Sequence, residues 1–90
     1  EISNFALHLH DTYGRALENI KAGLEMGIRT FDSSIGGLGG CPYAEGASGN
    51  VATEKVVELL ESQGFNTGID AKKLPLITRF IQEEILKTEL

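Results

Sequence analysis

Two short stretches of the chain have the residue pattern of a β-strand, the first by alternation of hydrophobic and polar residues and the second by its β-branched residues. The first covers residues 2–10, where the alternation is regular after Asn4. Its apolar face is expected to hold Phe5, Leu7 and Leu9. The second covers residues 28–34 and begins with β-branched and apolar side chains. The pattern therefore predicts two strands with a different kind of element between them.

The segment between the strands carries hydrophobic residues at helical spacing. In residues 15–26 they form one stripe, made of Leu17, Ile20 and Leu24. Asp11 and Thr12 stand before this segment and are able to cap its first turn. Gly27 follows it, where the end of a helix favours glycine. A strand, a helix and a strand in succession predict a parallel pair joined by a right-handed crossover.

The helical pattern returns after the second strand and its loop. Residues 51–63 are expected to form a helix that stops at Gly64, with Asn50 or Ser48 as its N-cap. Its inward-facing residues are expected to be Val56, Val57 and Leu60. Pro75 is expected to start a last helix. The apolar side of that helix would hold Ile77, Phe80, Ile81 and Ile85.

Two consecutive strand–helix units predict an α/β fold in which functional residues gather at the C-terminal ends of the strands. A closed (β/α)8 barrel takes about 250 residues, and this chain has strands for about a quarter of one. Its 90 residues contain no sign of an internal domain boundary. We therefore expect one incomplete domain whose open strand edges pair with further chain or with a second copy.

Charge and composition narrow the function classes. Eight Lys and Arg against 13 Asp and Glu give a formal net charge of -5, which argues against nucleic-acid binding. No apolar run approaches the roughly 20 residues that a membrane span requires. The single cysteine cannot form an internal disulfide and no signal segment is visible, so we expect a reducing, cytoplasmic compartment, with the mitochondrial matrix as the alternative.

A glycine-rich loop at residues 36–50 is the most unusual stretch of the chain. It holds six of the 11 glycines, the only cysteine, Cys41, and one of the two prolines, Pro42. Glycine permits close approach to a ligand, and long irregular loops are often functional, so the composition suits a mobile lid. Cys41 is either a small buried residue or, near a cation, an acid, base or nucleophile. The exposed loop favours the chemical role.

Two histidines on one strand face suggest a metal site. His8 and His10 are expected to project together at the C-terminal end of the first strand, where neutral imidazoles are able to share an ion. Asn50, at the end of the next strand and loop, would add an oxygen ligand, although helix capping also explains it. The mixed set suits Mg²⁺ or Mn²⁺ better than Zn²⁺. Paired histidines that are merely polar remain the alternative.

Three further polar residues lie near the same strand end. Glu54 is either a surface carboxylate favoured by the helix dipole or a carboxylate aimed at the strand-end pocket. Asp32 and Ser34 alternate along the second strand, so both are expected to point inward. Asp32 is interpreted as structural or as part of a polar network.

Two long strings give the chain a recognisable signature: HLHDTYG at residues 8–14 and GGLGGCPYAEGASGNVATE at residues 36–54. Together with the segments at 31–34 and 67–70, they closely resemble the C-terminal part of the hydroxymethylglutaryl-CoA lyase family. The resemblance covers nearly the whole chain. The second string distinguishes these lyases from related enzymes that carry only the histidine pair.

The resemblance implies the last two βα units and terminal helices of a (β/α)8 TIM barrel. It also implies a metal-dependent cleavage of 3-hydroxy-3-methylglutaryl-CoA to acetyl-CoA and acetoacetate. The open strand edges, separately, lead us to expect a homo-oligomer. By the same resemblance, His8, His10 and Asn50 bind Mg²⁺ or Mn²⁺, Cys41 and His8 are catalytic, and Glu54 lies near the site.

One departure limits this expectation. Members of the family also use an Arg-Asp pair near their first strand, and the 90 residues contain no such pair. We therefore expect the isolated chain to bind metal weakly and to lack useful lyase activity. The alternatives are a synthase or metal-dependent aldolase of the same superfamily, or a non-catalytic fragment that associates with itself.

Overall fold

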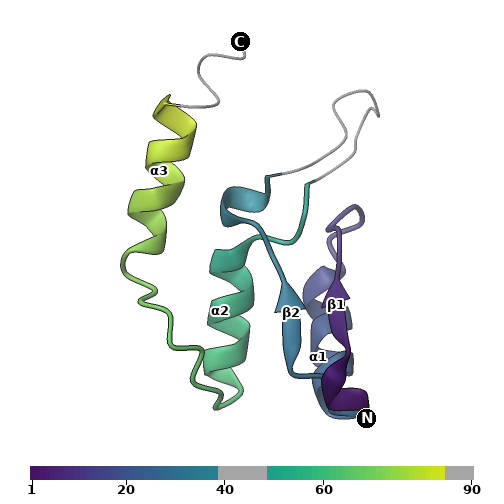
Figure 1. Cartoon of the computed structure of the whole chain (residues 1–90). Coiled ribbons are helices and arrows are strands. Elements are labelled where there is room, and N and C mark those ends of the chain that lie inside the picture. The colour runs from purple at the N-terminus through teal and green to yellow at the C-terminus, as the bar shows by residue number, and fades with distance from the viewer. Residues whose placement is uncertain (39–48, 85–90) are drawn as a thin grey trace.

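The computed structural model describes residues 1–38 and 49–84. Two short parallel strands, β1 (Ala6–His8) and β2 (Thr30–Asp32), lie side by side and are joined by the helix α1 (Ala16–Met26) (Figure 1). The predicted parallel pair and its helical crossover are confirmed. Both strands are shorter than expected, because pairing with a single neighbour supports only the three central residues of each.

The start of the first predicted strand is helical instead of extended. Ile2–Asn4 forms the 3₁₀ turn η1, and Phe5 is 62% exposed, so its expected place on the apolar face is wrong. Leu7 and Leu9 are half-buried, whereas His8 and His10 are exposed. The alternation therefore holds from Leu7 onward, where α1 covers one face of the strands.

The ends of α1 follow the sequence signals. The first helical N–H, from Ala16, donates to Asp11 Oδ1 at 3.1 Å. Gly27 ends the helix in the left-handed conformation with a φ of 103°, which side chains with a Cβ rarely adopt. The buried stripe is Ala16, Ile20, Gly23 and Leu24, and Leu17 is only half-buried.

The second strand leads through a short turn, η2 (Ile35–Gly37), and later into the helix α2 (Thr53–Ser62). Val56 and Val57 are buried on α2, as expected, and Leu60 is half-buried. The N-cap of α2 is Ala52, which makes no side-chain cap bond, so Asn50 does not cap this helix. Ser48 and Cys41 fall outside the described residues.

The last helix, α3 (Leu74–Glu84), contains Pro75 in its first turn, where a missing N–H is tolerated. The helix lies near η2, with Thr78 beside Gly36, and Leu74 is its buried residue. Much of the predicted apolar side is open to solvent, with Ile77 42% and Phe80 58% exposed. The expected Ile85 lies outside the described residues. The elements in residues 1–38 and 49–84 therefore leave much of the apolar side of α3 uncovered.

The core lies between α1 and α2 and under the strand ends. It consists of Ala16, Ile20, Leu24, Val51 and Val56. Ile20 and Val51 are almost completely buried, and full burial of one such side chain contributes about 1.5–3 kcal/mol. Within the described ranges, no helix is long and apolar enough to cross a membrane.

Candidate functional site

The carboxyl ends of β1 and β2 bring two polar side chains together. His8 and Asp32 are each the last residue of their strand, and the parallel register makes them direct partners. Nδ1 of His8 lies 3.3 Å from Oδ2 of Asp32, and both side chains are more than half exposed. Asp32 was expected to point inward but is exposed in the described structure, where it contacts one of the expected metal ligands.

Beyond the strands, the chain pairs with residues 49–51. The N–H of Asp11 donates to the Gly49 carbonyl at 3.2 Å, and the N–H of Val51 donates to the Leu9 carbonyl at 3.1 Å. These bonds set His10 opposite Asn50 in an isolated antiparallel bridge. Asn50, distant from His10 in the sequence, thus becomes its direct neighbour.

The two imidazoles lie close to one another. Their ring centroids are 5.7 Å apart, and the ring planes are inclined at 57°. Successive residues of an extended chain point to opposite faces, so His8 and His10, which are two residues apart, lie on the same face. The structure therefore brings together His8, His10 and Asn50, the three expected metal ligands.

The side chain of Asn50 is held in one orientation. Its Nδ2 donates to the Leu38 carbonyl at 3.0 Å, which fixes Oδ1 as the atom on the other side of the amide. Oδ1 is buried and has no hydrogen-bond partner in the described part of the chain. A buried acceptor without a partner is costly and needs an explanation. An oxygen ligand for a hard cation is one such explanation.

Glu54 is bound to the backbone of the turn that leads into the glycine-rich loop. Both of its carboxylate oxygens accept the N–H of Gly36, at 3.1 and 3.2 Å. Ser34 pairs with the chain around Ala52, and its carbonyl accepts the N–H of Thr53 at 2.9 Å. Glu54 thus ties the first turn of α2 to the start of the loop, and a catalytic role for it stays a prediction.

The ligand set is a mixture of imidazole and amide groups. In residues 1–38 and 49–84, no three His, Cys, Asp or Glu side chains gather closely enough to hold a metal ion. His8, His10 and Asn50 supply two nitrogens and one oxygen, which leaves room for further oxygen ligands in a divalent-metal site. The chemistry of the donor set therefore fits Mg²⁺ or Mn²⁺, and the buried Oδ1 supports that fit.

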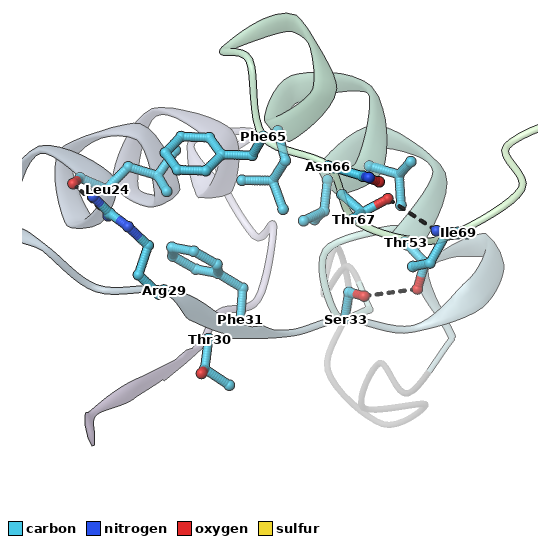
Figure 2. A pocket seen from close by; sticks show the side chains of 13 residues that line it. Leu24, Arg29, Thr30, Phe31, Ser33, Thr53, Phe65, Asn66, Thr67 and Ile69 are labelled. Atoms are coloured by element: carbon cyan, nitrogen blue, oxygen red, sulfur yellow. Dashed lines mark hydrogen bonds between the residues drawn. The ribbon is translucent and has the colours of Figure 1, made fainter. Parts of the chain in front are cut away.

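A separate cavity lies between β2, α2 and residues 65–69 (Figure 2). Its volume is about 390 Å³, and neither histidine lines it. Arg29 lies over the Phe65 ring at 5.1 Å from its centroid, and the Ser33 and Thr53 hydroxyls are 2.7 Å apart. This cavity opens on the helix-covered side of the strands, so it is distinct from the strand-end group.

Sequence reasoning missed two of these features. The His8–Asp32 contact depends on strand register, and only the alternation of Asp32 hinted at it. Arg29 and Phe65 are 36 residues apart in the numbering, and no local signal links them. A charged residue beside a strand and an aromatic residue after a helix are both common, so neither indicated a contact.

Comparison with known proteins gives consistent matches. The chain is 54% identical over 83 residues to the cytoplasmic 3-hydroxy-3-methylglutaryl-CoA lyase of Mus musculus, covering 92% of this chain and 24% of that protein. It is 58% identical over 80 residues to the mitochondrial hydroxymethylglutaryl-CoA lyase of Arabidopsis thaliana, covering 89% and 17%. The chain thus spans about a quarter or less of these curated relatives.

The structural match agrees with the sequence match. The HMG-CoA lyase of Brucella melitensis superimposes with a TM-score of 0.80 at 56% identity, covering 87% of this chain and 28% of that one. The Acinetobacter baumannii HMG-CoA lyase, in complex with coenzyme A and 3-methylmalate, gives 0.79 at 44% identity, covering 90% and 27%. The HMGL-like family model matches residues 1–81, so the chain belongs to the HMGL-like family.

Proposed function

We propose that the chain is part of a divalent-metal-dependent lyase that cleaves 3-hydroxy-3-methylglutaryl-CoA to acetyl-CoA and acetoacetate. The observation that carries this proposal is the buried Oδ1 of Asn50, which lacks a partner in the described residues and stands beside His10. The relatives in mouse and Brucella, both named as lyases of this substrate, support it.

The proposed architecture is the C-terminal part of a (β/α)8 barrel. The two parallel strands, each followed by a helix, would be its last two βα units, and the terminal helix would follow them. The whole of residues 1–90 would then lie in a single barrel domain. Within the described residues β1 and β2 have no neighbour but each other, which supports this arrangement, because a two-stranded sheet is marginal alone and open edges favour pairing with further strands.

His8, His10 and Asn50 would hold Mg²⁺ or Mn²⁺. When bound, such an ion supplies Lewis-acid polarisation of the substrate's oxygen atoms. The protein's task is then to orient these three donors, and two of them are already fixed by backbone pairing between residues 9–11 and 49–51. A carboxylate from outside residues 1–90 would complete the ligand set.

The proposed reaction needs one proton removed and one proton delivered. A base takes the proton from the 3-hydroxyl group, and the bond between C2 and C3 breaks as that oxygen forms the ketone of acetoacetate. The electron pair passes to C2, which becomes the enolate of acetyl-CoA and takes up a proton. His8 or Cys41 would donate that proton. Glu54 is proposed as the third catalytic residue, and its bond to Gly36 would also fix the start of the loop.

The compartment and the assembly state are also proposals. We propose a cytoplasmic location, and a mitochondrial matrix is the alternative, since both kinds of relative match the chain. We propose a homo-oligomer, which the exposed apolar side chains of α3 support. No nucleic acid or membrane partner is proposed, given the formal charge of -5.

The deciding experiment expresses the complete reading frame that encodes the chain and measures cleavage of 3-hydroxy-3-methylglutaryl-CoA with Mg²⁺. We expect acetoacetate from the wild type and a large loss in Cys41→Ala, with Glu58→Gln, an exposed carboxylate on α2, as the control. The 90-residue chain alone should give no useful turnover. Condensation of acetyl-CoA with a 2-oxo acid, in place of cleavage, would assign the protein to the synthases.

A non-catalytic, self-associating chain is the second candidate. The observation that favours it is the apolar surface of α3, where Leu76 is 65% and Phe80 58% exposed. Analytical ultracentrifugation of the 90-residue chain, together with the cleavage assay, distinguishes this candidate from the proposed lyase. A concentration-dependent oligomer that is weakened by Phe80→Ser, together with no cleavage by the complete protein, would support the second candidate.

A further inference from the structure

We propose that Asp32 is a positioning residue that holds the His8 ring through Nδ1 and so leaves Nε2 as the nitrogen available to a metal ion. This inference rests on the proposed function and deepens it. It starts from the contact between His8 Nδ1 and Asp32 Oδ2, 3.3 Å apart at the ends of two adjacent strands. A carboxylate that accepts a hydrogen bond from one ring nitrogen decides the tautomer of the imidazole.

The contact is a product of strand register. His8 and Asp32 are direct partners in the parallel ladder, two positions along from the pair Ala6 and Thr30. Both side chains therefore leave the sheet on the same face at the same level. A slip of one residue in either strand would put the carboxylate on the opposite face.

The register is fixed from the other face of the sheet. Leu7 and Phe31, which precede His8 and Asp32, both point toward Gly23 of α1. A Cβ placed on Gly23 would lie 2.7 Å from Leu7 Cδ1 and 3.6 Å from Phe31 Cε1. The absence of a side chain at position 23 thus lets α1 pack directly on both strands. Packing of α1 on one face of the strands therefore fixes the register that places His8 beside Asp32 on the other face.

The two histidines are not equivalent in this arrangement. His8 has a carboxylate beside its Nδ1, whereas His10 is positioned by backbone pairing with the segment around Asn50. With Nδ1 bound to Asp32 and Nε2 given to the metal, His8 has no free nitrogen to exchange a proton with the substrate. The inference therefore removes His8 from the two candidates for the enolate proton and leaves it as a ligand alone.

The test uses the protein expressed from the complete reading frame and labelled with ¹⁵N-histidine. It is carried out at about pH 8, where an ordinary imidazole is neutral. Long-range ¹H–¹⁵N spectra of the metal-free protein report which nitrogen of His8 carries the proton, and His8→Gln identifies its signals. We expect Nδ1–H in the wild type and in Asp32→Asn, whose amide oxygen still accepts. We expect a shift toward Nε2–H in Asp32→Ala. The control, Glu58→Gln, removes one exposed negative charge elsewhere and should match the wild type.

Metal affinity is the second readout. Mn²⁺ titration followed by calorimetry should show about 10–100-fold weaker binding in Asp32→Ala, the usual effect of losing such a partner. Asp32→Asn should fall between Asp32→Ala and the wild type, and Glu58→Gln should be unchanged. Equal loss in Asp32→Asn and Asp32→Ala would instead identify Asp32 as a direct ligand and overturn the positioning role.

Two other results would also decide the matter. An identical His8 tautomer in wild type and Asp32→Ala would refute the contact as an orienting device. A tautomer change with unaltered Mn²⁺ affinity would refute its importance for the metal. If the wild-type protein binds no Mn²⁺, the proposed function fails, while the tautomer comparison still decides whether Asp32 orients His8.

Discussion

Replacement of Asn50 by alanine gives the sharpest test of whether this position serves structure or metal binding. The wild-type side chain makes one hydrogen bond, from Nδ2 to the Leu38 carbonyl, and leaves Oδ1 buried without a partner in the described residues. The same carbonyl also accepts the backbone N–H of Asn50 at 3.3 Å, so alanine at position 50 does not leave it unsatisfied. The variant therefore loses the hydrogen bond from Nδ2 to Leu38 and no longer contains the unsatisfied Oδ1.

The two effects have opposite signs in the free energy of unfolding of the metal-free protein. The lost hydrogen bond costs about 0.5–1.5 kcal/mol, whereas removal of the unsatisfied buried acceptor returns about 1–3 kcal/mol. We therefore expect Asn50→Ala to change the free energy of unfolding of the metal-free protein by between about −0.5 and +2.5 kcal/mol, which is no loss or a modest gain. The metal-bound protein should behave differently. Mn²⁺ at 100 times its dissociation constant stabilises the wild type by about 2.7 kcal/mol, and the variant should lose most of this.

The assay is urea unfolding of the complete protein, followed by circular dichroism, with and without Mn²⁺. Asn19→Ala, an exposed asparagine on α1, is the matched control. It should gain roughly 0.5 kcal/mol from helix propensity and keep the whole Mn²⁺ effect. If Asn50→Ala lost 2 kcal/mol or more without metal and kept its Mn²⁺ stabilisation, Oδ1 would be a structural acceptor and the metal assignment would be wrong.

Three further substitutions test other parts of the site and core. Glu54→Gln weakens the contact with the Gly36 N–H, so we expect lower lyase turnover with little change in Mn²⁺ affinity by calorimetry; a loss confined to metal binding would contradict this. Gly49→Ala places a Cβ against the Gly37 carbonyl and within 2.8 Å of its carbon. This clash should lower the free energy of unfolding, measured in urea, by about 1–3 kcal/mol, and an unchanged value would contradict the close approach of the two segments. Ile20→Ala empties an almost completely buried position and should cost about 2–5 kcal/mol, whereas a cost below 1 kcal/mol would mean that α1 is not held by this core.

Local patterns in the sequence predicted the elements of the fold well. Alternation at Leu7 and Leu9 set the histidines on the opposite face, and Gly27 ended the first helix as expected. These features depend on residues only a few positions apart, because strand alternation and helix ends arise from the steric properties of neighbouring residues. These features can therefore be predicted from the sequence without knowledge of the tertiary packing.

Element ends and exposure were predicted less well, since both depend on neighbours. Phe5 matches the strand alternation yet lies open, because the chain before it turns into a 3₁₀ helix and nothing in the described residues covers it. Phe80 matches the apolar stripe of α3 but is 58% exposed, because no element among the described residues packs over it. An amphipathic pattern shows which face a residue shares, and only packing decides whether that face is covered.

The sequence by itself predicted that His8, His10 and Asn50 gather at one candidate site, with Glu54 as a possible fourth member, because strand–helix order places their segments at one end of a parallel sheet. Only the tertiary structure decided which groups each side chain contacts there. Asparagine is a common helix N-cap, yet Nδ2 of Asn50 donates to the Leu38 carbonyl. Its Oδ1 is buried and has no hydrogen-bond partner among the described residues. These contacts join residues that are distant in sequence, and their register is set by packing of the whole chain, so no local pattern could have specified them.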